Sequence, residues 1–167
     1  MYLKFMSLSR LLTKKPDAIA VLKGSEQFKT ITGTVYLYNT DIGVLMAVEV
    51  TGLPVSDEKC SNRFFAFHIH EGKECSGTME DPFSNAMTHY NPENCPHPHH
   101  AGDLPPLLSC SGKALSAFLT NRFTVDEVLG LTVIIHSNPD DFTTQPSGNS
   151  GEKIACGIIR KNSDISF

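Results

Sequence analysis

The histidines of this chain are concentrated in one stretch, since all seven lie between positions 68 and 136. His68 and His70 stand two residues apart in the run RFFAFHIH, and His136 ends a second apolar run, TVIIH. On an extended strand, the imidazoles of His68 and His70 would project from the same face. Imidazole nitrogens bind both copper and zinc, so the pattern is compatible with a metal site beside two strands. Alone, however, such a pair is more often structural than metal-bound.

A second group of candidate ligands strengthens the metal hypothesis. His97, His100 and Asp103 are spaced three residues apart in the segment HPHHAGD, where Pro and Gly disfavour a helix that would otherwise explain the spacing. A carboxylate beside imidazoles is an ordinary zinc ligand set. With His89 between the two groups, six imidazoles and a carboxylate exceed what one tetrahedral zinc needs. Two metals or a shared ligand are therefore predicted, and His89, whose ring has two nitrogens, is the natural bridge. The remaining His99 is expected to be a solvated loop histidine.

Short apolar runs separated by turn residues must position these side chains. About seven or eight such runs, with no convincing long helix, predict an all-β sandwich or barrel. Only residues 124–129 suit a helical turn, with Thr124 as a candidate N-cap. The clearest predicted strands span residues 18–23, 31–38, 44–50, 63–70, 113–119, 131–136 and 153–160.

Two long segments interrupt the strands. Residues 71–112 are rich in Gly, Pro, Asn, Cys and His, and residues 137–152 carry Asp140, Asp141 and several Gly and Ser. Long loops without secondary structure in a compact domain are usually functional or disordered. Because the histidines lie in these segments or at their borders, we expect both loops to be functional.

Composition and charge exclude several classes of protein. The formal charge is −4 and no block of Lys or Arg could follow a phosphate backbone, so nucleic acid is not an expected partner. No run approaches the roughly 18 apolar residues of a membrane-spanning helix. Residues 1–16 form an expected N-terminal extension, either a loose tail or a short surface helix, with a membrane or partner anchor as the alternative. They lack a secretory signal pattern, which favours a cytoplasmic location. Residues 17–167 are expected to be one domain.

Five cysteines, at positions 60, 75, 95, 110 and 156, form none of the paired CxxC arrangements of structural zinc sites. The odd number leaves at least one thiol unpaired within a monomer. Spacing alone does not decide which cysteines are bridged.

Five segments in order, FHIHEG, AMTHYNP, HAGDLPPL, VIIHSNPDD and GEKIACGII, resemble the signature of the copper–zinc superoxide dismutase family, in particular its bacterial members. The resemblance runs from about residue 18 to residue 161, nearly the whole chain. It implies an eight-stranded Greek-key β-sandwich or barrel, which is immunoglobulin-like. It also implies that superoxide is disproportionated to oxygen and hydrogen peroxide by alternate reduction and reoxidation of copper. The family leaves the oligomeric state open, with a homodimer as one candidate.

The resemblance also assigns roles to individual residues. His89 would bridge the two metals and carry a proton, and Asp140 would hydrogen-bond ligands of both. Lys153 stands where the family usually has an arginine, so it would guide the anion as a flexible point charge. The implied copper ligands are His68, His70, His89 and His136, and the implied zinc ligands are His89, His97, His100 and Asp103.

The resemblance implies a disulfide between Cys75 and Cys156. Cys95 and Cys110 flank the zinc segment, and we expect a second bridge between them over two free thiols, which leaves Cys60 unpaired.

Two other functions compete with a dismutase. One is a dismutase-like domain that binds copper or zinc without turnover. The other is a zinc hydrolase, which needs an open zinc position and a nearby general base. The full copper ligand set weighs against the first, and the four protein ligands of the zinc group weigh against the second.

Overall fold

The computed structural model describes residues 13–61 and 63–164. Most of the expected N-terminal extension, residues 1–12, lies outside this part. Pro16 and Asp17 are tied to the fold, because the Asn162 side chain donates to the Pro16 carbonyl (2.9 Å) and the Asn39 backbone donates to the Asp17 carboxylate (2.8 Å).

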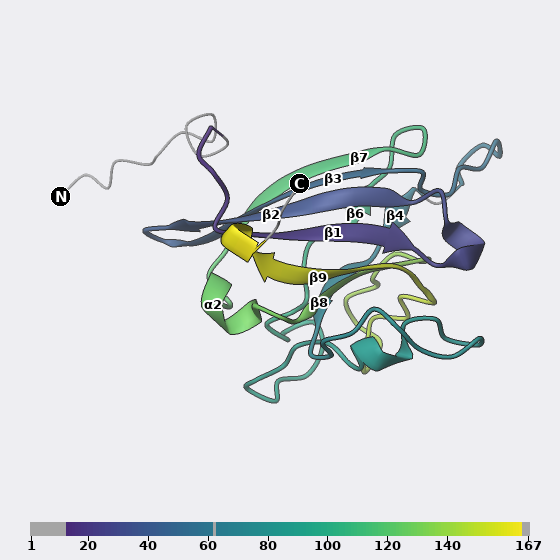
Figure 1. The fold of residues 1–167 in the computed structure, drawn as a ribbon. Helices are drawn as coiled ribbons and strands as arrows, with labels where there is room; N and C mark the ends of the chain where they lie inside the picture. The colour runs from purple at the N-terminus through teal and green to yellow at the C-terminus, as the bar shows by residue number, and fades with distance from the viewer. Residues whose placement is uncertain (1–12, 62, 165–167) are drawn as a thin grey trace.

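Seven antiparallel strands form one curled sheet in the order β5-β8-β9-β1-β2-β3-β7 (Figure 1). A second sheet pairs two short strands, β4 and β6. The strands of the large sheet are β1 (Ala18–Gly24), β2 (Thr32–Thr40), β3 (Gly43–Thr51), β5 (Phe67–His70), β7 (Ala114–Thr120), β8 (Thr132–His136) and β9 (Lys153–Lys161), and those of the small sheet are β4 (Phe64–Phe65) and β6 (Leu107–Leu108).

The core follows from the alternation of apolar residues along the strands. In the register of β2 and β3, Val35 lies opposite Val48 and Leu37 lies opposite Met46, and all four side chains are fully buried. Between them, Tyr36 projects to the other face of the sheet, where it packs in a smaller apolar cluster. The curled sheet therefore has its main core on its inner face, and β5 and β8 contribute Phe67, Ile69, Val133 and Ile135 to it.

The predicted all-β class is confirmed, with two local differences from the expected strands. Within the large sheet, β5 is the next strand after β3 along the chain but lies five places away in the sheet order, so the chain crosses the barrel between them. The expected strand at residues 63–70 is divided at Ala66. The backbone of Ala66 is hydrogen-bonded to Asn138, in the second long loop, and to His136, the last residue of β8. β6 lies inside the expected first loop, because Leu107 pairs with Phe65. Nine strands are present among the described residues.

The one predicted helical turn is confirmed as α2 (Val125–Val128). The Thr124 hydroxyl accepts a hydrogen bond from the Glu127 backbone, and the Glu127 carboxylate accepts from the Thr124 backbone. This reciprocal capping box satisfies amides that a helix start leaves without partners. No helix in the described ranges is long and apolar enough to cross a membrane.

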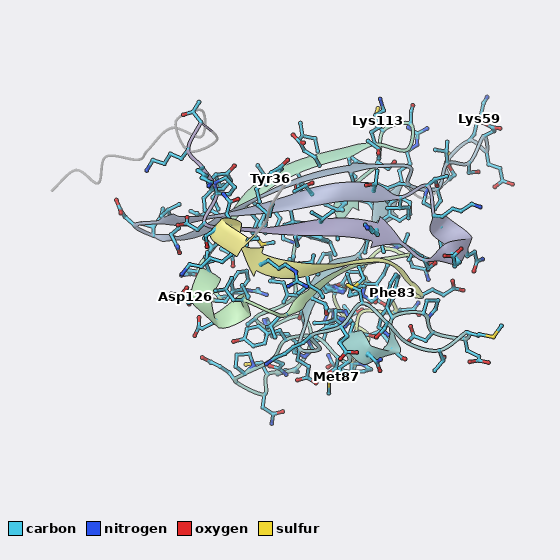
Figure 2. All side chains as sticks on the ribbon, viewed as in Figure 1. Tyr36, Lys59, Phe83, Met87, Lys113 and Asp126 are labelled. Atoms are coloured by element: carbon cyan, nitrogen blue, oxygen red, sulfur yellow. A yellow bond between two sulfur atoms is a disulfide. The ribbon has the colours of Figure 1, made fainter. Side chains whose placement is uncertain are left out.

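Three 3₁₀ turns complete the secondary structure, η1 (Glu26–Phe28), η2 (Ser84–Ala86) and η3 (Asn162–Asp164). The long loops form a layer on the β8 and β9 side of the sheet, and η2 belongs to it (Figure 1). The Cys75–Cys156 disulfide ties the first long loop to β9, with the two Cα atoms 5.6 Å apart. Phe83, labelled in Figure 2, and Ala86 pack beside this bridge against Ile134 of β8. The sheet thus provides a rigid base on which the loops are fixed.

Candidate metal centre

Two neighbouring strands and the first long loop supply one cluster of four histidines, which we call the strand cluster: His68, His70, His89 and His136. His68 and His70 lie on β5, and His136 ends the adjacent strand β8. One ring nitrogen from each of the four lies within 4.8 Å of the others, and all four residues are buried. The expected projection of His68 and His70 from one face of a strand therefore brings them together with His136.

Hydrogen bonds orient two of these rings. His70 donates from Nδ1 to the Met87 carbonyl (2.9 Å), and His136 donates from Nδ1 to the Gly151 carbonyl (3.3 Å). Their Nε2 atoms consequently face each other at 3.2 Å. Because both outer nitrogens already have acceptors, the two inner Nε2 atoms present lone pairs toward the same point. A cation between them would satisfy both.

The first long loop contributes a second cluster, which we call the loop cluster: His89, His97, His100 and Asp103. The loop docks on β5 by backbone hydrogen bonds, from Ile69 N to Gly102 O (2.9 Å) and from Tyr90 N to Ile69 O (2.8 Å). The Asp103 carboxylate lies 2.7, 3.1 and 3.2 Å from the Nδ1 atoms of His89, His97 and His100, respectively. It also accepts a hydrogen bond from the His100 backbone (3.0 Å), which fixes the three-residue spacing as a turn.

His89 belongs to both clusters, and its two nitrogens face different sides. Nδ1 contacts Asp103, whereas Nε2 is buried without a hydrogen-bond partner. His68 Nδ1 is also buried without such a partner, and so is His97 Nδ1, whose 3.1 Å contact with Asp103 is not a hydrogen bond. A buried polar atom without a partner costs about 1–3 kcal/mol. Three of them, each directed into one of the clusters, fit ligand atoms for two cations.

Asp140 lies between the clusters and contacts both, as the family resemblance implied. One carboxylate oxygen accepts from His68 Nε2 (2.8 Å), and the other accepts from His97 Nε2 (2.9 Å). These contacts leave Nδ1 of each ring as the free ligand atom. Asp140 therefore fixes the tautomer and the orientation of one histidine in each cluster.

Burial controls the protonation of the strand cluster. It lowers the pKa of His68 to about 4, although the hydrogen bond to Asp140 opposes the shift. Burial also lowers the pKa of His70 and of His136 well below the ordinary value, and the neighbouring histidine charges add to the effect. All three rings are therefore neutral near pH 7, which is the form that binds metals.

The pKa values of Asp140 and Asp103 are lowered as well, but here hydrogen bonds and nearby charges are the cause and burial opposes the shift. Burial alone would raise the pKa of Asp140, but hydrogen bonds from His68, the Phe142 backbone and His97 outweigh it and hold the pKa at about 2. For Asp103 the hydrogen bond from His89 and the nearby histidine charges likewise outweigh burial and lower the pKa. Both carboxylates are ionised at neutral pH, and they supply the negative charge that two cations need.

Three residues that the sequence did not single out hold the loop cluster in place. The Arg122 Nη1 donates to the carbonyls of Pro98 (3.2 Å), His100 (3.1 Å) and Asp103 (3.2 Å). Gln145 pairs with both backbone groups of His97, at 3.0 and 2.6 Å. At Gly148, which has φ +67°, a Cβ would lie 2.0 Å from Asp140 Oδ1. The Arg122 and Gln145 contacts join residues 19 to 48 positions apart in the sequence, so no local pattern could have indicated them.

The cysteine predictions were partly right. The Cys75–Cys156 disulfide is confirmed, and Cys60 is free as expected. The expected second bridge is wrong, because Cys95 and Cys110 are both free. Cys95 is held in a local turn, where the Asn91 side chain bonds both its backbone groups. Cys110 lies in the separate turn between β6 and β7, paired with Lys113.

A pocket of about 880 Å³ opens beside the strand cluster. His70, His89 and His136 line it, and so does Lys153, the first residue of β9. His100 also reaches the pocket, whereas His97 and Asp103 do not line it. His99 does not line the pocket either, and its side chain is exposed, as expected for a solvated loop histidine. The arrangement offers two adjacent cation sites, one of which faces the pocket with a positive side chain nearby.

Comparisons with known proteins all find similarity to one family. A family model described as copper/zinc superoxide dismutase (SODC) matches residues 31–159. A Cu-Zn superoxide dismutase (number 2) of Aquifex aeolicus is 35% identical over 145 residues, which cover 78% of this chain and 80% of the relative. The Cu-Zn superoxide dismutase of Deinococcus radiodurans is 32% identical over 153 residues, with 81% and 80% covered. That of Legionella pneumophila is 32% identical over 136 residues, with 77% of each chain covered.

Proposed function

Because the chain belongs to the copper/zinc superoxide dismutase family, we propose that it converts superoxide into oxygen and hydrogen peroxide at the two clusters of its metal centre. The strand cluster would hold copper and the loop cluster would hold zinc. The loop cluster includes the carboxylate that zinc accepts readily, whereas the strand cluster offers imidazoles alone. Copper supplies the redox chemistry when it is bound, since it passes between two oxidation states and zinc does not.

The observation that carries this proposal is the position of His89. It is the one residue common to both clusters, with Nδ1 beside Asp103 and Nε2 buried without a partner. An imidazole in that position can join two metals only after it loses both ring protons. The shared ring distinguishes a coupled two-metal centre from two independent structural sites.

The protein must also deliver protons. Two superoxide ions and two protons give one oxygen and one hydrogen peroxide, as one superoxide loses an electron and the other gains it. We place one proton at Nε2 of His89, because this atom has no other partner and the residue lines the pocket. The opposite nitrogen, Nδ1, faces Asp103 inside the loop cluster. A cation held by that cluster would therefore keep the ring oriented while Nε2 carries the proton.

Lys153 is the residue we assign to anion binding. Its side chain is only 16% exposed and lines the pocket together with His70, His89 and His136. Among the described lining residues it is the only Lys or Arg. Local positive charge increases the rate at which an anion reaches a site, even when the whole protein is negative.

The alternative functions make different demands on the site. A zinc hydrolase needs an open coordination position, but the loop cluster already offers three imidazoles and a carboxylate. A metal-binding domain without turnover would have no use for a lysine in the pocket. Activity measurements separate this second alternative from a dismutase.

The test is superoxide dismutation by protein reconstituted with one copper and one zinc. We expect strong copper-dependent activity, a loss of more than about 100-fold in His136→Ala, since losing a ligand should exceed the loss of an outer partner, and a partial loss in Lys153→Ala. His99→Ala is the matched control, because this exposed histidine belongs to neither cluster. Full metal loading with no activity above that of free copper would contradict the proposal and leave a metal-binding relative of the family.

The homodimer and the cytoplasmic location stay predictions. Sedimentation of the metal-loaded protein measures the first, and fractionation of cells that express the chain measures the second.

A further inference from the structure

Lys153 already has an anionic partner inside the pocket. Its ammonium group forms an ion pair with the carboxylate Oδ2 of Asp81, which lies 72 residues earlier in the chain. Both residues line the pocket beside the strand cluster. The single lysine among the described residues of the pocket wall is therefore paired with a carboxylate of the same wall.

Asp81 is held firmly in this position. Its other carboxylate oxygen accepts from the Phe83 backbone (3.1 Å), and its own backbone N–H donates to the Thr78 hydroxyl (3.1 Å). The backbone of Gly77 passes so close that a Cβ would lie 2.2 Å from the Asp81 carbonyl. The loop that carries Asp81 is anchored to β9 by the Cys75–Cys156 disulfide, three residues beyond Lys153. The pair is thus formed between two fixed backbones, and the flexible partner is the lysine.

The other charges in the pocket make this contact consequential. Four carboxylates line the described pocket against the single lysine, and they belong to Glu71, Glu80, Asp81 and Glu152. Of the four, Asp81 alone forms an ion pair with Lys153. A lysine is a mobile point charge with three N–H donors, so an incoming anion must share the ammonium charge with Asp81 or draw it away.

We propose that Asp81 sets the anion affinity of the pocket by competing with the incoming anion for Lys153. The ligand class is a small monovalent anion, with superoxide as the substrate and azide as a stable probe. The inference rests on the proposed function for the identity of the substrate, but not for the competition itself. Asp81 is then a specificity residue that lowers anion capture, and its removal should make the pocket a better anion site.

The prediction concerns Asp81→Asn, which keeps the size of the side chain and removes its charge. In the copper- and zinc-loaded protein we expect the azide dissociation constant, read from the copper absorption spectrum, to fall by about three- to tenfold. The second-order rate constant for superoxide should rise by a similar factor. Its decrease with added salt should become steeper, because an unpaired Lys153 charge is screened by ions.

Two further variants make the test specific. Glu80→Gln removes one negative charge from the adjacent pocket residue and leaves the ion pair intact, so we expect a smaller change than in Asp81→Asn. In a Lys153→Ala background, Asp81→Asn should have no effect on azide affinity. Circular dichroism and the metal content of each variant establish that the fold and the site are retained.

The outcomes separate this inference from the proposed function. Weaker or unchanged azide binding in Asp81→Asn would overturn the competition, and so would an equal gain in Glu80→Gln or a gain that persists without Lys153. If azide binding follows the expected order while no variant, nor the parent protein, dismutates superoxide, the role of Asp81 is supported and the proposed function is wrong.

Discussion

The strand cluster and the loop cluster share His89 but are built in different ways. In the strand cluster, three histidines come from two hydrogen-bonded strands of the sheet, and their outer nitrogens are held by Asp140 and by backbone carbonyls of both long loops. In the loop cluster, all four residues lie within residues 89–103, and a carboxylate is one of them. The strand cluster faces the pocket with Lys153, whereas His97 and Asp103 lie behind it.

This difference indicates that the strand cluster and the loop cluster have different roles. A redox metal needs access for its substrate and ligands that stay fixed while its charge changes, and a sheet provides such a frame. A metal that organises a loop needs a complete set of donors close together in the sequence, and residues 89–103 provide one. Asp140 and His89 connect the two parts, so a change at either should affect both metals.

The largest effect that can test this contrast is the pH dependence of the metal-free protein. The folded-state pKa of His68, about 4, lies below the ordinary value of about 6.5, and the pKa values of His70 and His136 are lowered as well. The unfolded chain therefore binds more protons below pH 6.5, and unfolding becomes easier as the pH falls from about 6.5 toward 4. Each extra proton contributes a slope of up to about 1.4 kcal/mol per pH unit.

Urea unfolding of the metal-free protein between pH 7.5 and 4.5 measures this slope. His70→Gln should reduce it, because this variant removes one of the buried histidines whose pKa is lowered. An unfolding free energy that stays constant across this range would show that burial of the strand cluster does not oppose protonation.

The link between the clusters is tested next by Asp140→Asn. The amide keeps the shape of the carboxylate but carries no charge and replaces one acceptor with a donor. One of His68 and His97 therefore loses its partner, and the other keeps only a weaker, neutral acceptor. Loss of such an outer partner costs about 10–100-fold in metal affinity. Titrations with copper and with zinc should show both affinities reduced.

Asp141→Asn is the matched control for this change. The Asp141 carboxylate accepts hydrogen bonds only from its own loop, at Thr143 and Thr144, among the contacts described. We expect its metal affinities to stay close to those of the parent protein. A fall in only one affinity in Asp140→Asn would mean that the carboxylate does not couple the two clusters.

The smallest of the expected effects concerns Gly148→Ala. The new Cβ would lie 2.0 Å from Asp140 Oδ1 and 2.7 Å from His97 Nε2, so it should push apart the contact that orients the loop cluster. We expect zinc affinity to fall by about tenfold, the lower figure for a disturbed outer partner, and copper affinity to fall less.

Gly130→Ala is the control that distinguishes the steric effect of the Gly148 Cβ from the strain of placing alanine at a positive φ. Gly130 also has a positive φ, +84°, but a Cβ there would have nothing within 4 Å. Both variants should therefore lose stability, while Gly148→Ala alone should lose zinc affinity. Equal zinc affinity in the two variants would remove Gly148 from the site.

The sequence was most informative where the chemistry depends on local geometry. Side chains alternate between the two faces of a strand, so His68 and His70, two residues apart, were predicted to share one face. The regular spacing of His97, His100 and Asp103 in a loop with Pro and Gly indicated that these three belong together. The cap at Thr124 was visible because its partner Glu127 is only three residues away. The family resemblance added the division of the ligands between copper and zinc, the role of Asp140 and the Cys75–Cys156 bridge, which spacing alone did not specify.

What the sequence could not give depends on contacts between distant segments. Arg122 meets the carbonyls of the loop cluster across 19 to 24 residues, and Gln145 meets His97 across 48. The same limit explains the wrong bridge, because Cys95 and Cys110 flank one segment in the sequence but belong to two separate local turns. For the same reason, the sequence did not indicate the ion pair between Lys153 and Asp81, which are 72 residues apart.

Anomalous diffraction from crystals of the reconstituted protein, recorded on both sides of the copper and zinc absorption edges, tests the division between the clusters most directly. We expect a copper signal among His68, His70, His89 and His136, and a separate zinc signal among His89, His97, His100 and Asp103. Copper in the loop cluster of active protein, or a single metal position for both elements, would contradict the assignment of redox chemistry to the strand cluster.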